Sequence, residues 1–316
     1  MKLTVVAGVD SSSQSCTVSL HHYLKGDLLG VGRSPHPATT PPCSEQEPED
    51  WWKAFRIALF EACNNANLRP SDIGAISFAA QYHGLVALDS SNKVLRAVKL
   101  WNDTTSSTQA QKLVDKMGAS EWAHRVGSVP TSAFTISKVA WLKENEPDVY
   151  GKMAGILVPH DWLSMQLCGE RITDRVDASG TGYFDAVNNE WRTDILDLVE
   201  PRSDWLQMLP RVVGPNEFAG FAITERAKEI GLNPRTKIAC GTGDQAASAL
   251  AIDVKDGDIV ISLGTSGTVY GSTSKGIYDE SGFLNVTANA RGGFLPIAVL
   301  LNAAKVTDTF CRLLGV

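Results

Sequence analysis

The chain has 316 residues, with 29 Lys or Arg, 35 Asp or Glu and 6 His, so its formal net charge is −6. With 43% hydrophobic and 20% charged residues, it has the composition of a globular protein of about two domains. The mild acidity argues against nucleic acid as a partner, and no apolar run approaches the ~20 residues of a membrane helix. The six cysteines form no CxxC pair, which indicates reduced thiols and predicts a cytoplasmic protein without a membrane partner.

The first 35 residues predict an antiparallel meander. A strand over 3–9 leads through a small-residue turn over 10–14 into a strand over 15–22, and a third strand follows the turn at 25–27. After a proline-rich loop, Pro48 begins a helix. Its apolar residues recur at helical spacing and predict one buried face, made of Trp51, Ala54, Phe55, Ala58, Leu59 and Ala62.

Two further strands are predicted over 73–79 and 85–88, and the residues between them, Gln81-Tyr82-His83-Gly84, form a polar turn. The middle of the chain alternates amphipathic helices with loops, two of which we expect at 174–185 and 187–192.

The last third begins with a strand over 237–240 and a glycine turn that opens an alanine-rich helix over 245–252. A strand over 259–263, a turn over 264–267 and a returning strand over 268–271 follow. This second turn repeats the design of the turn at 10–14. One such turn in each half indicates two related domains that face each other. A final helix is predicted around 302–314.

The two hairpin turns are the first candidate site. Small residues let backbone N–H groups approach an anion closely, and hydroxyl groups add further donors. Asp10, beside the first turn, is a carboxylate suited to Mg²⁺ or to its water ligands. The alternative is that both are ordinary tight turns without a ligand.

The second candidate is the segment over 241–245. Asp244 has the chemistry of a general base for a substrate hydroxyl, and Gln245 could orient that substrate. The alternative is that Asp244 is a helix N-cap. The same segment also matches the dinucleotide-binding pattern GxGxxG/A, although the expected acidic residue after the next strand is absent.

The third candidate joins Tyr82 and His83 to Trp101 in the sequence Trp101-Asn102-Asp103. Polar and aromatic groups at the carboxyl end of a strand can hold a polyol. Alternatively, Tyr82 and His83 lie on the surface and Trp101 belongs to the core. The remaining histidines show no partner spacing and are interpreted as structural or solvated: His21, His22, His36, His124 and His160.

Seven motifs in register resemble the FGGY family of carbohydrate kinases. They are Gly8–Ser15, Ser44–Pro48 with Trp51-Trp52, Gln81–Gly84, Leu100–Asp103, Asp174 with Asp177–Thr181, Gly241–Gln245 and Ser262–Gly267. The resemblance runs from residue 5 to about 310. It is strongest with the family members that act on D-xylulose.

The resemblance implies an α/β protein with the actin-like ATPase (ribonuclease H-like) fold, in which two domains enclose a cleft for sugar and ATP. Asp244 would be the catalytic base, and Tyr82, His83, Trp101 and Gln245 would contact the sugar with it. Asp10 would hold Mg²⁺ through water. The phosphates would be held by Ser12, Ser13, Gln14, Gly264, Thr265, Ser266 and Gly267. Because phosphoryl transfer depends on alignment and charge neutralisation, this set of groups is sufficient.

The resemblance implies ATP-dependent phosphorylation of a ketopentose, D-xylulose to D-xylulose 5-phosphate. Alternatives are a family member for ribulose, gluconate or glycerol, a non-catalytic sugar-binding fragment, and a dinucleotide-dependent oxidoreductase. A homodimer is left open.

Three features depart from the family pattern. Ser12 replaces a glycine in the first phosphate turn, and Thr104-Thr105 follow Asp103 where many members have an arginine. The glycine-rich loop for adenosine is expected beyond residue 316. We therefore expect residues 1–250 to form the sugar-binding domain and 251–316 to begin a truncated nucleotide-binding domain.

Overall fold

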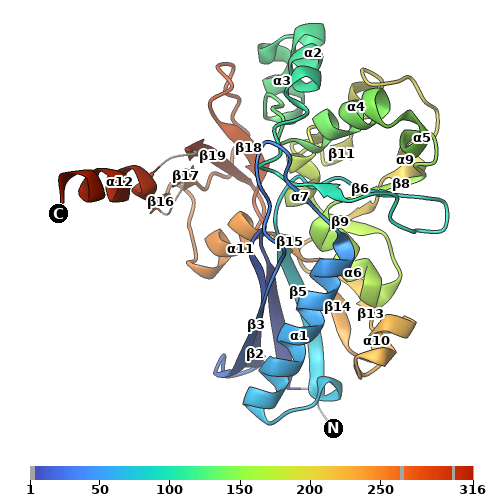
Figure 1. Cartoon of the computed structure of the whole chain (residues 1–316), viewed down its shortest axis with the longest axis vertical. Helices are drawn as coiled ribbons and strands as arrows, with labels where there is room; N and C mark the ends of the chain where they lie inside the picture. The colour runs from blue at the N-terminus through green and yellow to red at the C-terminus, as the bar shows by residue number, and fades with distance from the viewer. Residues whose placement is uncertain (1–3, 264–266, 301–302, 316) are drawn as a thin grey trace.

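The structure, a computed structural model, describes residues 4–263, 267–300 and 303–315 (Figure 1). Its largest sheet is built from β1 (Val5–Ser11), β2 (Ser15–His22), β3 (Leu28–Pro35), β5 (Ile73–Ala80), β13 (Phe218–Phe221), β14 (Lys237–Ala239) and β15 (Thr242–Gly243). The strand order is β13-β14-β5-β1-β2-β3, with β15 also paired to β5. The predicted meander β1–β2–β3 is antiparallel, whereas β5 runs parallel to β1. β1 extends past the predicted end at Val9 and includes Asp10, so the first turn shortens to residues 12–14.

The helix α1 (Pro48–Ala66) packs against β2 and β3, and the apolar face predicted from its spacing is buried throughout. Its axis comes so close to β3 that a Cβ on Gly32 would lie 2.1 Å from the carbonyl oxygen of Ala58. α6 (Pro159–Cys168) joins α1 in the same core, where the rings of Trp51 and Trp162 meet edge to face with centroids 6.3 Å apart. This core supports the strands that end at the candidate site.

A helical lobe follows the central strand β5 along the chain and has an apolar core of its own. Its helices are α2 (Ser107–Met117), α3 (Ala119–Val126), α4 (Thr135–Asn145), α5 (Pro147–Tyr150), α8 (Thr193–Leu196) and α9 (Trp205–Met208). The remaining short elements are η1 (Pro70–Asp72), β4 (Glu45–Gln46), β6 (Val86–Leu88), β7 (Val98–Lys99), β8 (Gly155–Leu157), β9 (Ile172–Asp174), β10 (Phe184–Asp185), β11 (Glu190–Trp191), β12 (Arg211–Val213) and α10 (Glu225–Glu229).

The prediction of a loop over 174–185 is wrong, because this segment contains a short buried helix, α7 (Arg175–Gly180). The carboxylate of Asp174 caps this helix by accepting a hydrogen bond from the backbone N–H of Asp177 at 2.9 Å. The expected loop at 187–192 also contains β11, which pairs with β10 in a hairpin.

The last part of the chain forms a separate antiparallel sheet in the order β16-β17-β19-β18. It consists of β16 (Ile259–Leu263), β17 (Gly267–Gly271), β18 (Asn285–Ala288) and β19 (Phe294–Leu300), preceded by α11 (Asp244–Ala251) and followed by α12 (Ala304–Leu314). In Figure 1, α11 lies between this sheet and the large one. Since β16 joins an antiparallel sheet and not a parallel βαβ unit, the dinucleotide-binding interpretation of residues 241–246 is wrong.

Among the described residues, no helix has the length and apolar character needed to cross a bilayer. The predicted final helix is α12, on which the apolar side chains of Phe310 and Leu313 are 58% and 75% exposed.

Candidate functional site

A cavity of about 190 Å³ lies where the carboxyl ends of the large sheet meet the antiparallel sheet. A single water molecule needs only ~10–15 Å³ by this measure, so the cavity has room for a small polyol. The structure brings the five predicted sugar residues together in its lining: Tyr82, His83, Trp101, Asp244 and Gln245. Ser13, from the first predicted phosphate turn, lines the same cavity.

Tyr82 and His83 enter the cavity because they lie two and three residues after the end of β5, the strand between β1 and β14. They are half-buried, which rules out the alternative of free surface residues. The ring of Tyr82 lies against Gly243, where a Cβ would come within 2.2 Å of the Tyr82 ring carbon Cζ. Glycine is therefore required there by the close approach of the ring.

Asp244 is the first residue of α11, and the N-cap position belongs to Gly243. Its carboxylate accepts a hydrogen bond from the backbone N–H of Gln245 at 2.8 Å. Burial, followed by the negative charges of Asp10 and Asp177, raises the pKa of Asp244 to about 7. A carboxyl with a pKa near neutrality is suited to proton transfer, which a simple helix cap would not need.

Two side chains hold the backbone of the first turn in place. His36 Nδ1 donates to the carbonyl oxygen of Ser12 at 2.9 Å, and Gln46 donates to that of Ser13 at 3.1 Å. On the side of the cavity, the indole N–H of Trp101 donates to the Ser13 hydroxyl at 2.8 Å. Trp101 therefore belongs to the cavity wall. The hydroxyl of Ser12 donates to the exposed carboxylate of Asp10.

Gln14, the remaining residue of the first predicted phosphate turn, is exposed, and its carbonyl oxygen accepts a hydrogen bond from the backbone N–H of His36 at 2.8 Å. Of the second predicted turn, Gly264, Thr265 and Ser266 lie outside the described residues. Gly267 begins β17 and is buried, and Thr268 directly after it lines the cavity together with Ser13. The two hairpins therefore meet at one cavity.

The far wall of the cavity was not predicted from the sequence. This wall comes from the antiparallel sheet and consists of Thr268, Asn285, Thr287, Leu295, Ile297 and Val299. Within β18 and β19 these residues recur at every second position, which is the period of one strand face. That alternation was the available signal. It identifies a common face but not what the face meets.

A buried polar cluster near Asp244 was likewise not predicted from the sequence. His160 is fully buried, and its Nδ1 contacts the carboxylate of Asp177 on α7, while its Nε2 lies 3.1 Å from Asp161. Thr242 donates to Asp174 at 2.8 Å in the same cluster. Although burial lowers the pKa of His160, the surrounding carboxylates outweigh this and raise it to about 10. His160 is therefore a structural histidine, one of the two roles expected for it, and the spacing did not indicate its contact with Asp177, 17 residues away in sequence.

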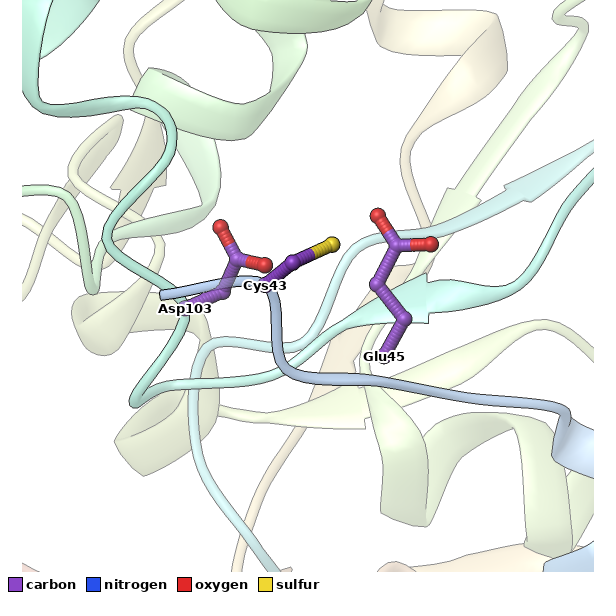
Figure 2. Close-up of side chains that lie close together, drawn as sticks. All are labelled: Cys43, Glu45 and Asp103. Carbon is purple, nitrogen blue, oxygen red and sulfur yellow. The ribbon is translucent and has the colours of Figure 1, made fainter. Parts of the chain in front are cut away.

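Cys43, Glu45 and Asp103 lie side by side, as Figure 2 shows. Asp103 belongs to the same segment of the chain as Trp101. The ligand atoms of Cys43, Glu45 and Asp103 are close enough for a metal, but the cluster already holds a cation. The ammonium of the buried Lys99 lies 2.8 Å from Glu45 and 3.6 Å from Asp103. Asp103 in turn accepts from the backbone N–H of Ser44 at 2.8 Å. The cluster is therefore an ion-pair network that anchors the Trp101 segment.

The chain was compared with known proteins. The model of the FGGY family of carbohydrate kinases, N-terminal domain, matches residues 5–251. The chain is 39% identical over 314 residues to a xylulose kinase of Streptomyces rubiginosus, an alignment that covers 98% of this chain and 63% of the relative. It is 31% identical over 298 residues to a xylulose kinase of Escherichia coli K12, covering 92% of this chain and 57% of the relative. The chain thus spans less than two thirds of the length of these curated relatives.

Among solved structures, the xylulose kinase from Bifidobacterium adolescentis superposes with a TM-score of 0.85 at 34% identity, covering 99% of this chain and 68% of that one. The xylulose kinase from Rhodospirillum rubrum has the same fold, with a TM-score of 0.90 at 23% identity and coverage of 98% and 63%. The predicted fold class, α/β of the actin-like ATPase type, is confirmed. The chain belongs to the FGGY family of carbohydrate kinases.

Proposed function

We propose that the protein takes part in ATP-dependent phosphorylation of a ketopentose, D-xylulose, to D-xylulose 5-phosphate. One observation carries this proposal: a single cavity is lined by a carboxylate of raised pKa, by four polar or aromatic side chains suited to a polyol, and by a serine of an amide-rich turn. The relatives named above as xylulose kinases support D-xylulose as the sugar.

On the sugar side, Asp244 accepts the proton of the hydroxyl that attacks the terminal phosphate of ATP. The oxygen–phosphorus bond forms as the bond to the leaving ADP breaks, and the proton remains on the Asp244 carboxyl. Tyr82, His83, Trp101 and Gln245 orient the sugar so that this hydroxyl points toward the phosphate. Fixed alignment of this kind is a large part of catalysis in phosphoryl transfer.

On the phosphate side, the residues at 12–14 and 264–267 hold the phosphate groups of ATP. Asp10 is exposed, and its negative charge lies near enough to Asp244 to raise the pKa of that carboxyl. A divalent cation would relieve this repulsion, so these residues fit Mg²⁺. Asp10 would hold Mg²⁺ through water, and the ion would neutralise phosphate charge. We further propose residues 1–250 as the sugar-binding domain and 251–316 as the first part of a nucleotide-binding domain.

The test is an assay of ADP release by this chain with ATP and Mg²⁺ against D-xylulose, D-ribulose, glycerol and gluconate. We expect the highest kcat/KM with D-xylulose. A higher value with another of these compounds would assign that compound as the substrate and reject D-xylulose.

A second candidate is a sugar-binding protein without kinase activity. It is favoured by the cavity lining, which contains all five predicted sugar residues but, of the predicted phosphate residues that the structure describes, only Ser13. Calorimetry with D-xylulose separates the two candidates. Sugar binding without any ADP release would support this second candidate, and absence of both would contradict the sugar site itself.

A further inference from the structure

Lys138, on α4, is a lysine with no exposed surface, located beside the sugar cavity. Within the described part of the chain its ammonium forms no ion pair. It donates instead to two backbone carbonyls, that of Ala133 and, at 3.0 Å, that of His83. Burial lowers the pKa of Lys138 to about 7. The charge of Asp103 opposes this shift without forming an ion pair, and burying an ammonium with no carboxylate at ion-pair distance is unfavourable, so stability alone does not explain this residue.

The acceptor of this hydrogen bond has an unusual backbone. His83 has a φ of 67°, in the left-handed region that side chains other than glycine seldom adopt. Its carbonyl oxygen accepts a second hydrogen bond from the Thr135 hydroxyl at 3.1 Å. The Phe134 ring packs against the His83 ring with centroids 4.9 Å apart. Three neighbouring residues at the start of α4 therefore hold His83 in its strained conformation.

The ring of His83 is also fixed in its tautomer. Nδ1 lies 2.6 Å from the carbonyl oxygen of Gly180, and because a carbonyl only accepts, Nδ1 carries the proton. Burial, with the charge of Lys138, lowers the pKa of His83 to about 3, so the ring is neutral. Nε2 is then an acceptor without a proton. Since His83 lines the cavity, the group it recognises there is a hydrogen-bond donor such as a sugar hydroxyl.

We infer that Lys138 is a positioning residue for the sugar site: by holding the His83 carbonyl, it keeps the His83 ring oriented to accept a hydrogen bond from a sugar hydroxyl. This inference rests on the proposed function for its sugar. It assigns no contact between Lys138 and the substrate. Its effect on binding passes through His83 alone.

The first experiment needs no substrate. In protein labelled with ¹⁵N-histidine, the His83 ring signals, assigned by their loss in His83→Ala, should show the Nδ1-protonated tautomer in the wild type. In Lys138→Met, which keeps the length of the side chain and removes its donors, we expect a mixture of tautomers. Lys143→Met is the matched control on the same helix, because Lys143 donates to the carbonyl of Val199 and is 39% exposed. An unchanged His83 spectrum in Lys138→Met would overturn the inference.

The second experiment is a double-mutant cycle on D-xylulose affinity by calorimetry. Lys138→Met should weaken binding about tenfold in the wild-type background and have no further effect in the His83→Ala background. An equal loss of affinity in both backgrounds would mean a general structural role and contradict the inference.

If thermal unfolding shows that Lys138→Met does not fold, Thr135→Val replaces it. This variant removes the other donor to the same carbonyl with little change in side-chain volume. A Thr135→Val protein with unchanged affinity and an unchanged His83 tautomer would overturn the inference. If the wild type binds no D-xylulose, the proposed function fails, and the tautomer measurement still tests the contact between Lys138 and His83.

Discussion

The ring of Tyr82 occupies the space that a side chain on Gly243 would need, with only 2.2 Å between the Tyr82 Cζ atom and the position of a Cβ on Gly243. The two residues belong to different segments, one following β5 and the other ending β15, which pairs with β5. Their contact joins the segment that carries the predicted sugar residues to the segment that carries Asp244.

Gly243→Ala should therefore move the Tyr82 ring into the cavity and weaken D-xylulose binding by at least about tenfold, ~1.4 kcal/mol. Calorimetry measures this change. Gly214→Ala is the control, because the nearest atom to a Cβ on Gly214 lies at 3.9 Å, an ordinary van der Waals distance. Equal affinity in Gly243→Ala and the wild type would show that Tyr82 does not bind the sugar in its present orientation.

Asp244→Asn keeps the size of the side chain and removes its basicity. We expect kcat to fall by about 10²–10⁴, the usual contribution of a general base, with sugar affinity within about tenfold of the wild type. Because burial and nearby carboxylates raise the pKa of Asp244 from 3.8 to about 7, this carboxyl destabilises the folded state progressively as the pH rises from about 4 to about 7, and the full cost remains above pH 7. Asp244→Asn should therefore raise the melting temperature at about pH 8.

The control for this variant is Asp148→Asn, at an exposed position on α5, which should change neither kcat nor the melting temperature. A rate like that of the wild type in Asp244→Asn would leave Asp244 with only its helix-terminal role.

Much of this site could be predicted from local patterns. The helical spacing of the apolar residues in α1 predicted its buried face. The polar residues after β5 indicated the cavity, because the carboxyl ends of neighbouring parallel strands lie at the same edge of a sheet. The far wall could not be predicted. Asn285 and Thr287 share one face of β18, but the sequence does not specify that this face meets Tyr82 across the cavity.

The helix α7 was missed for a different reason. Its six residues include valine, aspartate, serine and glycine, which have low helix propensity and favour a loop. Tertiary contacts outweigh that preference, since Asp177 bonds to the Asp174 cap through its backbone and contacts the buried His160 through its side chain. Such a polar cluster depends on contacts that only the folded chain makes.

His160→Gln should change how stability depends on pH. The pKa of His160 is raised from 6.5 to about 10 in the folded protein, because the carboxylates of Asp161 and Asp177 outweigh burial. The stability from this proton is fully present below about pH 6.5 and is lost as the pH rises toward 10. In that window the free energy of unfolding of the wild type should fall by ~1.4 kcal/mol per pH unit from this group.

Urea denaturation at about pH 8 and about pH 10 tests this. The difference in the free energy of unfolding between the wild type and His160→Gln should be smaller at the higher pH. His124→Gln is the control, as His124 is 46% exposed and pairs with Glu280 at the surface. A difference that stays constant between these two pH values would mean that His160 is neutral in the folded protein.

Lys99→Met should remove the cation that Glu45 and Asp103 share. Lys99 is 2% exposed, and without it the fully buried carboxylate of Asp103 has no ion-pair partner among the described residues. Breaking a buried pair in this way costs about 3–5 kcal/mol, so we expect a loss of that size in the free energy of unfolding. Lys112→Met breaks the ion pair between Lys112 and Glu144, whose side chains are 56% and 43% exposed, and should lower the free energy of unfolding by no more than about 1 kcal/mol.

The wild type should melt at the same temperature with and without EDTA, because Lys99 and not a metal neutralises the cluster. A lowered melting temperature in EDTA, or equal losses in the two lysine variants, would contradict this assignment.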